Sequence, residues 1–204
     1  MRLLLVEISC ILTLLLACGA VAETLSHPAV PIVESLHTEM LETMQGADAL
    51  GYQGRFDKLQ NALGNSFDLD FMARKAVGRS WKKFSAPEQE RWLGTFERVT
   101  CANYAGRFTG YSGQSFETLG VEPASHETVL VHTRLIDPDG ENVDLNYRLA
   151  ETPNGWRIID VYLDGTVSEL ALRRSEYSAV IKRDGLDELV SSIDRRVDEL
   201  ASVQ

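Results

Sequence analysis

GWRIIDVYLDGTVSEL, residues 155–170, joins an apolar run to a turn signal and predicts a buried strand that leads into a helix. Side chains alternate along a strand, which gives two apolar faces: Trp156, Ile158 and Tyr162 on one, and Ile159, Val161 and Leu163 on the other. A strand that is apolar on both faces has to be covered on both, at least in part. Asp164-Gly165 predicts the turn, with Asp164 as the cap of the following helix. The core of the protein is therefore expected around this segment.

Three more strands are predicted before this one, because the hydrophobic period changes from helical to two after Gly113. They cover residues 116–121, 128–136 and 143–149. In the last of them Val143, Leu145, Tyr147 and Leu149 alternate with polar residues. Turn-forming residues lie at 137–140 and 152–155, where proline and glycine set the corners. This order predicts an antiparallel meander.

Helices are predicted on both sides of the sheet, within residues 28–110 and 166–201. Ser85-Ala86-Pro87-Glu88 is a capping box with proline in the first turn, which marks a helix start. Helices that are segregated from an antiparallel sheet define the α+β class. We expect an α+β fold in which helices before and after a four-stranded antiparallel sheet at 115–164 form a cone. The pattern leaves open whether its interior is filled.

The N-terminus has the features of a secretory signal peptide. Residues 1–22 contain Arg2, a Leu/Ile-rich run, and then Ala20-Val21-Ala22, an A-x-A cleavage site. A membrane anchor and lipidation of Cys18 after processing at Leu15–Ala17 are the alternatives. Leu16 is a poor residue at a lipoprotein site, so cleavage after Ala22 is favoured. We expect an exported protein that comprises one domain, residues 23–204, in the periplasm.

Charge and cysteine content exclude some classes of function. The net charge of −10 disfavours nucleic acid and firm adhesion to an anionic bilayer. Cleavage after Ala22 removes Cys10 and Cys18, so that Cys101 is the only remaining cysteine and no internal disulfide can form. Cys101 lies among apolar residues of a predicted helix, where a buried, inert thiol is expected.

No catalytic, cofactor or metal motif emerges from the sequence. His126-Glu127 begins like a zinc-protease helix, but Leu130 occupies the place of the second histidine and the segment reads as a strand. Asp160 shares a predicted strand face with Trp156 and Tyr162, where a carboxylate with a raised pKa would act as a base. A hydrogen-bonded carboxylate on the outer face of the sheet is the favoured interpretation. We therefore expect no catalytic residues, no metal and no cofactor.

Several motifs follow one another along the chain: FDLDFMAR at 67–74, GRSW at 78–81, Pro87-Glu88-Gln89, Tyr104 and Tyr111-Ser112-Gly113. In this order they resemble the MlaC family of periplasmic lipid carriers. The segments 156–170 and 173–177 are more similar to the hopanoid-associated HpnM branch. The resemblance covers roughly residue 67 to the C-terminus. It implies an apolar pocket and a soluble shuttle between an inner-membrane lipid transporter and the outer membrane, with a phospholipid or a hopanoid as cargo.

The expected lipid-binding residues come from the long helix, the sheet and the segment after it. They are Phe71, Tyr104, Phe108, Val131, Leu145, Tyr147, Val161, Leu163, Val167 and Leu170. A carrier needs such a lining because each methylene removed from water contributes about 0.8 kcal/mol. We expect it to act as a monomer. Two alternatives stay open: a small enzyme with Asp160 as base, and an assembly protein whose grooves bind a partner helix.

Overall fold

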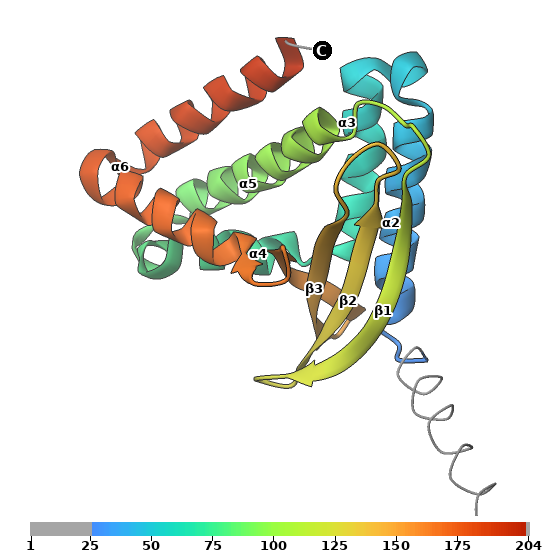
Figure 1. The fold of residues 1–204 in the computed structure, drawn as a ribbon. Helices are drawn as coiled ribbons and strands as arrows, with labels where there is room; N and C mark the ends of the chain where they lie inside the picture. Colours follow the sequence, from blue (N-terminus) through green and yellow to red (C-terminus); the bar gives the residue numbers. More distant parts are fainter. Residues whose placement is uncertain (1–25, 203–204) are drawn as a thin grey trace, which may run out of the picture.

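The computed structural model describes residues 26–202, so the predicted signal peptide and the alternative lipidation site Cys18 lie outside the described residues. Helices come first, a sheet follows, and a long bent helix closes the chain (Figure 1). The helical part comprises α2 (Val30–Gln45), α3 (Ala47–Ser66), α4 (Leu69–Val77), the 3₁₀ helix η1 (Gly78–Lys83) and α5 (Ala86–Arg107). The α+β prediction is confirmed.

The sheet is an antiparallel meander with strand order β1-β2-β3-β4-β5. Its strands are β1 (Ser115–Ala124), β2 (Thr128–Ile136), β3 (Val143–Thr152), β4 (Gly155–Leu163) and β5 (Val167–Ser168). The predicted number of four strands is wrong by one, because β5 was assigned to the following helix. Two residues are too few to show a period, and β5 exists only because it pairs with the end of β4.

A β-bulge in β4 changes the predicted faces of this strand. Arg148 pairs with Asp160 and Leu149 with Ile158, so Ile159 is the additional residue. After the bulge Val161 faces the same side as Ile158, and both belong to the main core. The assignment of these two residues to opposite faces is therefore wrong, since it assumed unbroken alternation. The bulge lets Trp156, Ile158, Val161 and Leu163 face the same side of the sheet.

Side-chain caps set the start of two helices, and the capping box predicted at residues 85–88 is one of them. The Asp68 side chain accepts a hydrogen bond from the Phe71 amide at 2.9 Å and caps α4. At the start of α5, Glu88 accepts hydrogen bonds from the amide and the hydroxyl of Ser85. In α3 the chain kinks at Gly51, where φ is 58°, and the helix continues to Ser66.

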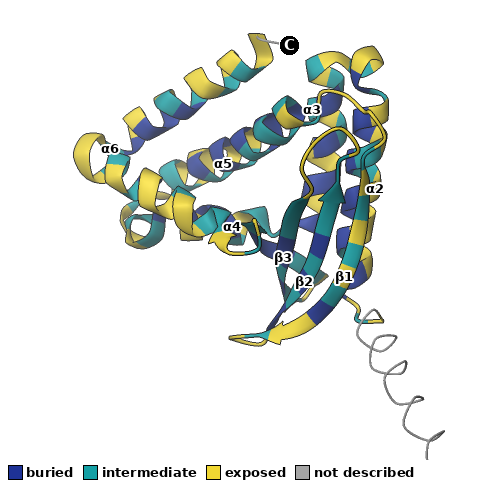
Figure 2. Cartoon of the chain, viewed as in Figure 1, coloured by how far each residue is buried: buried dark blue, intermediate teal, exposed yellow. Residues whose placement is uncertain are grey.

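The core fills the space where α2 and α3 meet the sheet and extends between α4, α5 and α6, where Figure 2 also shows buried residues. Fully buried side chains come from both helices and from the inner face of the sheet; they include Val33, Leu36, Leu59, Leu63, Val131 and Leu149. The Phe67–Asp68 connection joins this core through a hydrogen bond of 2.9 Å from the Asp68 amide to the Ile158 carbonyl. No helix within residues 26–202 is long and apolar enough to cross a bilayer.

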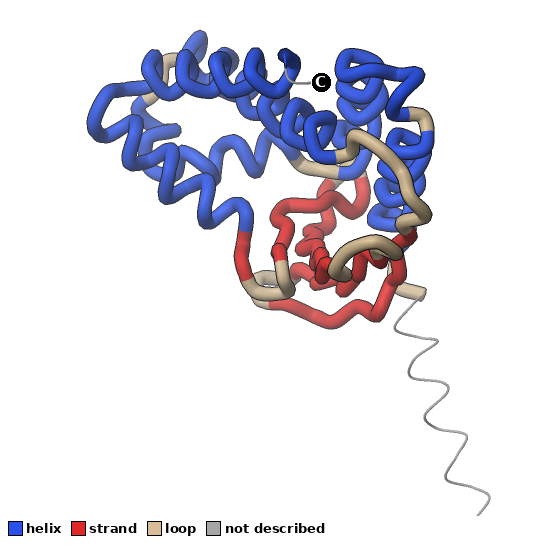
Figure 3. Tube along the Cα trace, turned by 45° about the horizontal axis from the view of Figure 1, so that its top comes forward, coloured by secondary structure: helices blue, strands red, loops and turns tan. Residues whose placement is uncertain are grey.

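The last helix, α6 (Glu169–Ser202), consists of two segments that meet at Gly185, where φ is 88°. Its first segment starts beside the end of the sheet, and its second folds back along α5 (Figure 3). Arg91 and Arg98 of α5 form ion pairs with Asp187 and Asp194 of this second segment. The helix therefore reaches from the sheet over the outer side of α5.

Candidate binding cavity

One face of α5 lines an apolar cavity. Residues of this face recur three and four positions apart: Phe96, Val99, Thr100, Asn103, Tyr104 and Arg107. Phe108 continues the row just after the helix ends. The face turns from aromatic and aliphatic side chains toward a polar end at Asn103 and Arg107. One helix therefore supplies both an apolar wall and a polar rim.

The sheet and α6 complete the cavity, which has a volume of about 310 Å³. The sheet contributes Leu135, Val143, Leu145, Tyr147, Val161 and Leu163, and α6 contributes Glu169, Leu170, Arg173 and Tyr177. This volume lies at the lower end of the range of roughly 300–1,000 Å³ that small-molecule sites span. A ligand with a hydrocarbon portion binds such a cavity most favourably, because apolar surface is then removed from water.

The structure brings seven of the ten predicted lining residues together around this cavity. They are Tyr104, Phe108, Leu145, Tyr147, Val161, Leu163 and Leu170. The other three lie elsewhere. Phe71 does not line the cavity because its neighbour on α4, Met72, faces it instead. Val131 is fully buried in the core between sheet and helices. Val167 is 49% exposed, since the short β5 turns it away from the interior.

Sequence reasoning missed lining residues from the helices and from the sheet. They are Met40, Phe67, Met72, Phe96, Val99, Leu135, Val143 and Tyr177, with the polar Thr100, Asn103, Arg107, Glu169 and Arg173. The helical period of α5 already carried a signal for Phe96 and Val99, because they share the stripe of Tyr104. Met40 and Tyr177 also lie on apolar helical patterns, but no local pattern shows that α2 and α6 border the same space.

A buried histidine fixes the floor of the cavity. The His37 ring nitrogen Nε2 lies 3.1 Å from the Tyr147 hydroxyl, and the His37 ring stacks on Phe116 at 3.8 Å between centroids. Burial lowers the pKa of His37 from 6.5 to about 3, so the ring is neutral at physiological pH. Burial also raises the pKa of the Tyr147 hydroxyl well above its usual value. Two neutral groups thus satisfy each other beneath an apolar surface.

The rim of the cavity carries both signs of charge. Arg173 lies 3.8 Å from the carboxylates of Glu169 and Glu176 on its own helix. Arg107 is exposed at the end of α5 on the same rim. A second hollow between α5 and the far part of α6 adjoins this rim and shares Asn103, Arg107 and Arg173 with the cavity. The polar groups are therefore concentrated at one end of the apolar space.

Asp160 has a structural position. Its carboxylate accepts hydrogen bonds from the Ser168 hydroxyl at 2.6 Å and from the Leu170 amide at 3.1 Å, as well as from the Val161 amide. Burial raises the pKa of the Asp160 carboxyl, and these hydrogen bonds oppose the rise. Asp160 does not line the cavity. The geometry therefore gives no support to the hypothesis of a base that faces a substrate, and it agrees with a hydrogen-bonded carboxylate.

The start of α6 differs from the prediction. The Ser168 hydroxyl accepts a hydrogen bond from the Ala171 amide at 2.9 Å, so Ser168 and Asp160 satisfy the first amides of the helix. Asp164, the predicted cap, lies instead in the turn after β4 with φ of 48°. The additional strand β5 separates that turn from the helix. Asp160 thus ties β4 to α6 and fixes the edge of the cavity.

Two further expectations concern reactive groups. Cys101 is buried, as expected, and burial raises the pKa of its thiol to about 12. Such a thiol stays protonated and is a poor nucleophile. Among residues 26–202, no three histidine, cysteine or carboxylate side chains gather in a way that would hold a metal ion.

Comparison with known proteins places this geometry in a family. A family model described as MlaC protein matches residues 34–195, which include every element that lines the cavity. The chain belongs to the MlaC family. The comparison does not distinguish an HpnM branch within it. The family match extends well ahead of residue 67, where the motif resemblance begins.

Two known proteins are similar to this chain over long stretches. The intermembrane phospholipid transport system binding protein MlaC of Haemophilus influenzae is 23% identical over 139 residues, which are 66% of this chain and 64% of that protein. The chain thus matches slightly less than two thirds of that relative's length. A solved phospholipid-binding protein of Ralstonia solanacearum, in complex with a phospholipid, is 25% identical with a TM-score of 0.76. That match covers 86% of this chain and all of the solved one.

Proposed function

We propose that this protein is a periplasmic carrier that holds the hydrocarbon part of a membrane lipid in the cavity between α5, α6 and the sheet. The observation that carries the proposal is the apolar cavity of about 310 Å³ in a fold that is shared with a phospholipid-bound relative. Each methylene that enters the cavity contributes about 0.8 kcal/mol, so an acyl chain is strongly favoured over water. No chemical step is needed for this task.

The cargo that we propose is a phospholipid, with a hopanoid as the alternative that the motifs at 156–177 favour. The cavity has an apolar interior and a rim with Arg107, Arg173 and Glu169. A phospholipid would place its chains inside and its charged headgroup at this rim. The carrier would act alone and exchange lipid with transporter components of the inner membrane and with an acceptor or donor in the outer membrane. The predicted signal peptide supports this location.

Solvent extraction tests the proposal. Freshly purified protein should release about one equivalent of lipid into organic solvent, and mass spectrometry should identify phospholipid rather than hopanoid or no lipid at all. Release of hopanoid would identify the cargo as a hopanoid and would still support a carrier function. Absence of any lipid, together with failure to take up lipid from mixed vesicles, would contradict the proposal and favour a partner-binding or enzymatic role.

A pair of tryptophan variants locates the site. Leu145→Trp places an indole in the cavity, whereas Val167→Trp places the same indole at an exposed position of β5. Leu145→Trp should reduce bound lipid several-fold, and Val167→Trp should leave it unchanged. Equal lipid content in both variants, with both folded, would mean that the lipid binds outside this cavity.

A further inference from the structure

A further concave surface lies against α6, on a helix face next to the one that borders the lipid cavity. We call it the cationic groove; it lies between η1 and the first segment of α6, has a volume of about 630 Å³, and is lined by Val77, Arg79, Ser80, Lys83, Phe84, Arg174, Ser178, Ile181 and Lys182. The α6 residues Arg174, Ser178 and Lys182 recur every four positions and share one helix face. Leu170, Arg173 and Tyr177, which line the lipid cavity, lie on the adjoining face, and Leu170 is one turn ahead of Arg174. A single helix segment therefore borders both surfaces.

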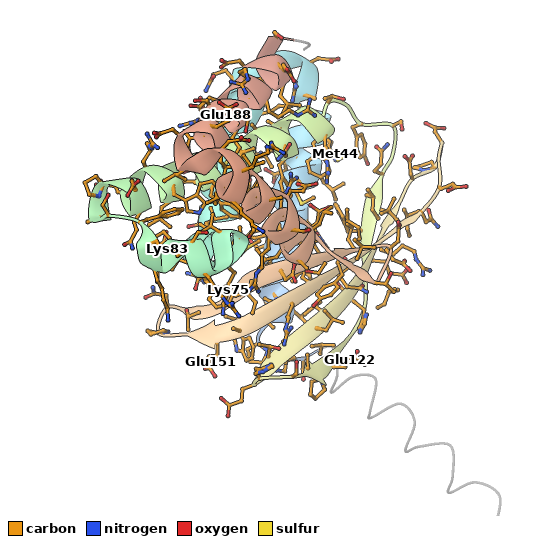
Figure 4. The ribbon with its side chains drawn as sticks, turned by 90° about the vertical axis from the view of Figure 1, so that its left-hand side faces the viewer. Met44, Lys75, Lys83, Glu122, Glu151 and Glu188 are labelled. Carbon is orange, nitrogen blue, oxygen red and sulfur yellow. The ribbon has the colours of Figure 1, made fainter. Side chains whose placement is uncertain are left out.

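The charge of the cationic groove contrasts with that of the protein. The chain has a net charge of −10, yet residues 71–87 contain five basic side chains and no acidic one. The basic residues are Arg74, Lys75, Arg79, Lys82 and Lys83. Arg174 and Lys182 of α6 add to them from across the groove. Figure 4 shows Lys75 and Lys83 on the segment that lies alongside α6. A local positive surface thus exists on an acidic molecule.

The four basic residues that line the groove are not neutralised by neighbours. Arg79, Lys83, Arg174 and Lys182 are exposed, and none of their side chains has an ion pair or hydrogen bond within residues 26–202. Nearby cations behave differently, since Arg74 pairs with Asp70 and Arg183 with Asp184. Four like charges around one hollow repel one another unless an anionic group lies between them.

The floor of the groove is apolar. Val77 is buried, and the half-buried Phe84 and Ile181 contribute apolar surface beside it. The Arg174 side chain lies over Gly78, where a Cβ would be 3.1 Å from its Nε atom. The groove thus combines an apolar floor with a cationic rim. This combination matches an amphipathic segment that carries carboxylates along its edges.

We propose that the cationic groove is the docking site for an acidic amphipathic segment of a partner protein. A flat anionic bilayer fits this surface less well, because its phosphates would reach the rim but not the apolar floor of a hollow. The partner would lie against the helix whose adjoining face lines the lipid cavity. The proposal rests on the groove alone, and it holds whether or not the cavity carries lipid.

Site-specific photo-crosslinking in intact cells tests this surface in the full chain. A photoreactive side chain at Ser178 lies within the groove, and one at Leu172, which is 45% exposed on another side of α6, is the control. We expect a crosslinked protein from position 178 and not from position 172. Mass spectrometry of the crosslinked peptide should show a segment with several aspartates or glutamates beside apolar residues.

Charge reversal shows whether the groove's cations carry the interaction. Lys83→Glu combined with Lys182→Glu should reduce the crosslink yield about tenfold or more, because like charges would then face each other. Lys58→Glu combined with Arg195→Glu changes the net charge equally but lies outside the groove, and should leave the yield unchanged. Thermal melting shows that both variants fold, and their lipid content shows that the cavity is intact.

Several outcomes would overturn the proposal. They are no crosslink from position 178, a crosslinked segment without carboxylates, and an equal yield in the groove variant and its control. If the original protein sediments with phosphatidylglycerol vesicles and the groove variant does not, the groove binds a bilayer instead of a partner protein. If the original protein carries no lipid but still crosslinks from position 178, the carrier function is contradicted and the docking site is not. The two proposals can therefore fail separately.

Discussion

The inner face of the sheet borders two regions that look alike in sequence and differ in space. The packed region, where α2 and α3 cover the sheet, buries Leu59, Leu63 and Val131 completely. The hollow region, where α5 and α6 meet the sheet, leaves Leu145 and Leu163 half-buried around a cavity. Both regions use leucine, valine and aromatic residues at regular spacing. The difference shows that helix placement, rather than apolar content, creates the binding space.

The largest expected effect is on the free energy of unfolding, when one leucine in each region is replaced by alanine. Leu63→Ala removes a fully buried side chain from the packed region and should lower the free energy of unfolding by about 2–5 kcal/mol. Leu163→Ala removes a half-buried side chain beside the cavity and should cost about 1 kcal/mol or less in lipid-free protein. Urea denaturation measures both. Equal losses would mean that the cavity is as tightly packed as the core.

A pH effect of intermediate size concerns His37, which links the packed region to the cavity floor. Its pKa is about 3 in the folded protein and 6.5 in the unfolded chain, so only the unfolded chain binds a proton between these values. The contribution of His37 to stability is complete above pH 6.5 and declines as the pH falls toward 3. Between pH 7 and pH 5 the loss should be about 2 kcal/mol.

The variant His37→Phe isolates this effect. It leaves the Tyr147 hydroxyl without its partner, so it should lower stability at pH 7, but it should remove the part of the pH dependence that His37 causes. His132→Gln on β2 replaces a more exposed histidine and is the control. Chemical denaturation at several pH values gives both slopes. An unchanged slope in His37→Phe would show that the buried ring is not the titrating group.

The smallest expected effect concerns Asp160, which lies outside both regions but fixes α6 over the hollow one. Asp160→Asn weakens the charge-assisted hydrogen bonds to Ser168 and Leu170 and should cost about 1–2 kcal/mol. Lipid content and lipid transfer should stay close to those of the original protein. Thermal melting and transfer between vesicles check the two statements. If transfer were abolished in a folded, lipid-loaded variant, a catalytic role of Asp160 would regain support.

Strands β3 and β4 show how far local patterns reach. In β3 the alternation of Leu145, Tyr147 and Leu149 predicted one inner face, and all three do face inward. In β4 the same rule failed at Ile159, because a bulge depends on pairing with the neighbouring strand and leaves no mark on the period. The lining residues divide in the same way. Tyr104 followed from the helical stripe of α5, whereas the exposure of Val167 depended on the pairing of β5.

The sequence by itself determined the class of fold, the order of its elements and several of their ends. Capping residues such as Ser85 and Glu88, the turn at Asp137–Gly140 and the alternation in β3 act between near neighbours, so their effects are local. Only the tertiary structure decided which apolar residues pack and which surround a space. That outcome depends on the distance of α5 and α6 from the sheet. Contacts between separate elements set this distance, such as the hydrogen bond from the Leu170 amide of α6 to Asp160 of β4. A hollow is a property of this spacing, and no single segment contains it.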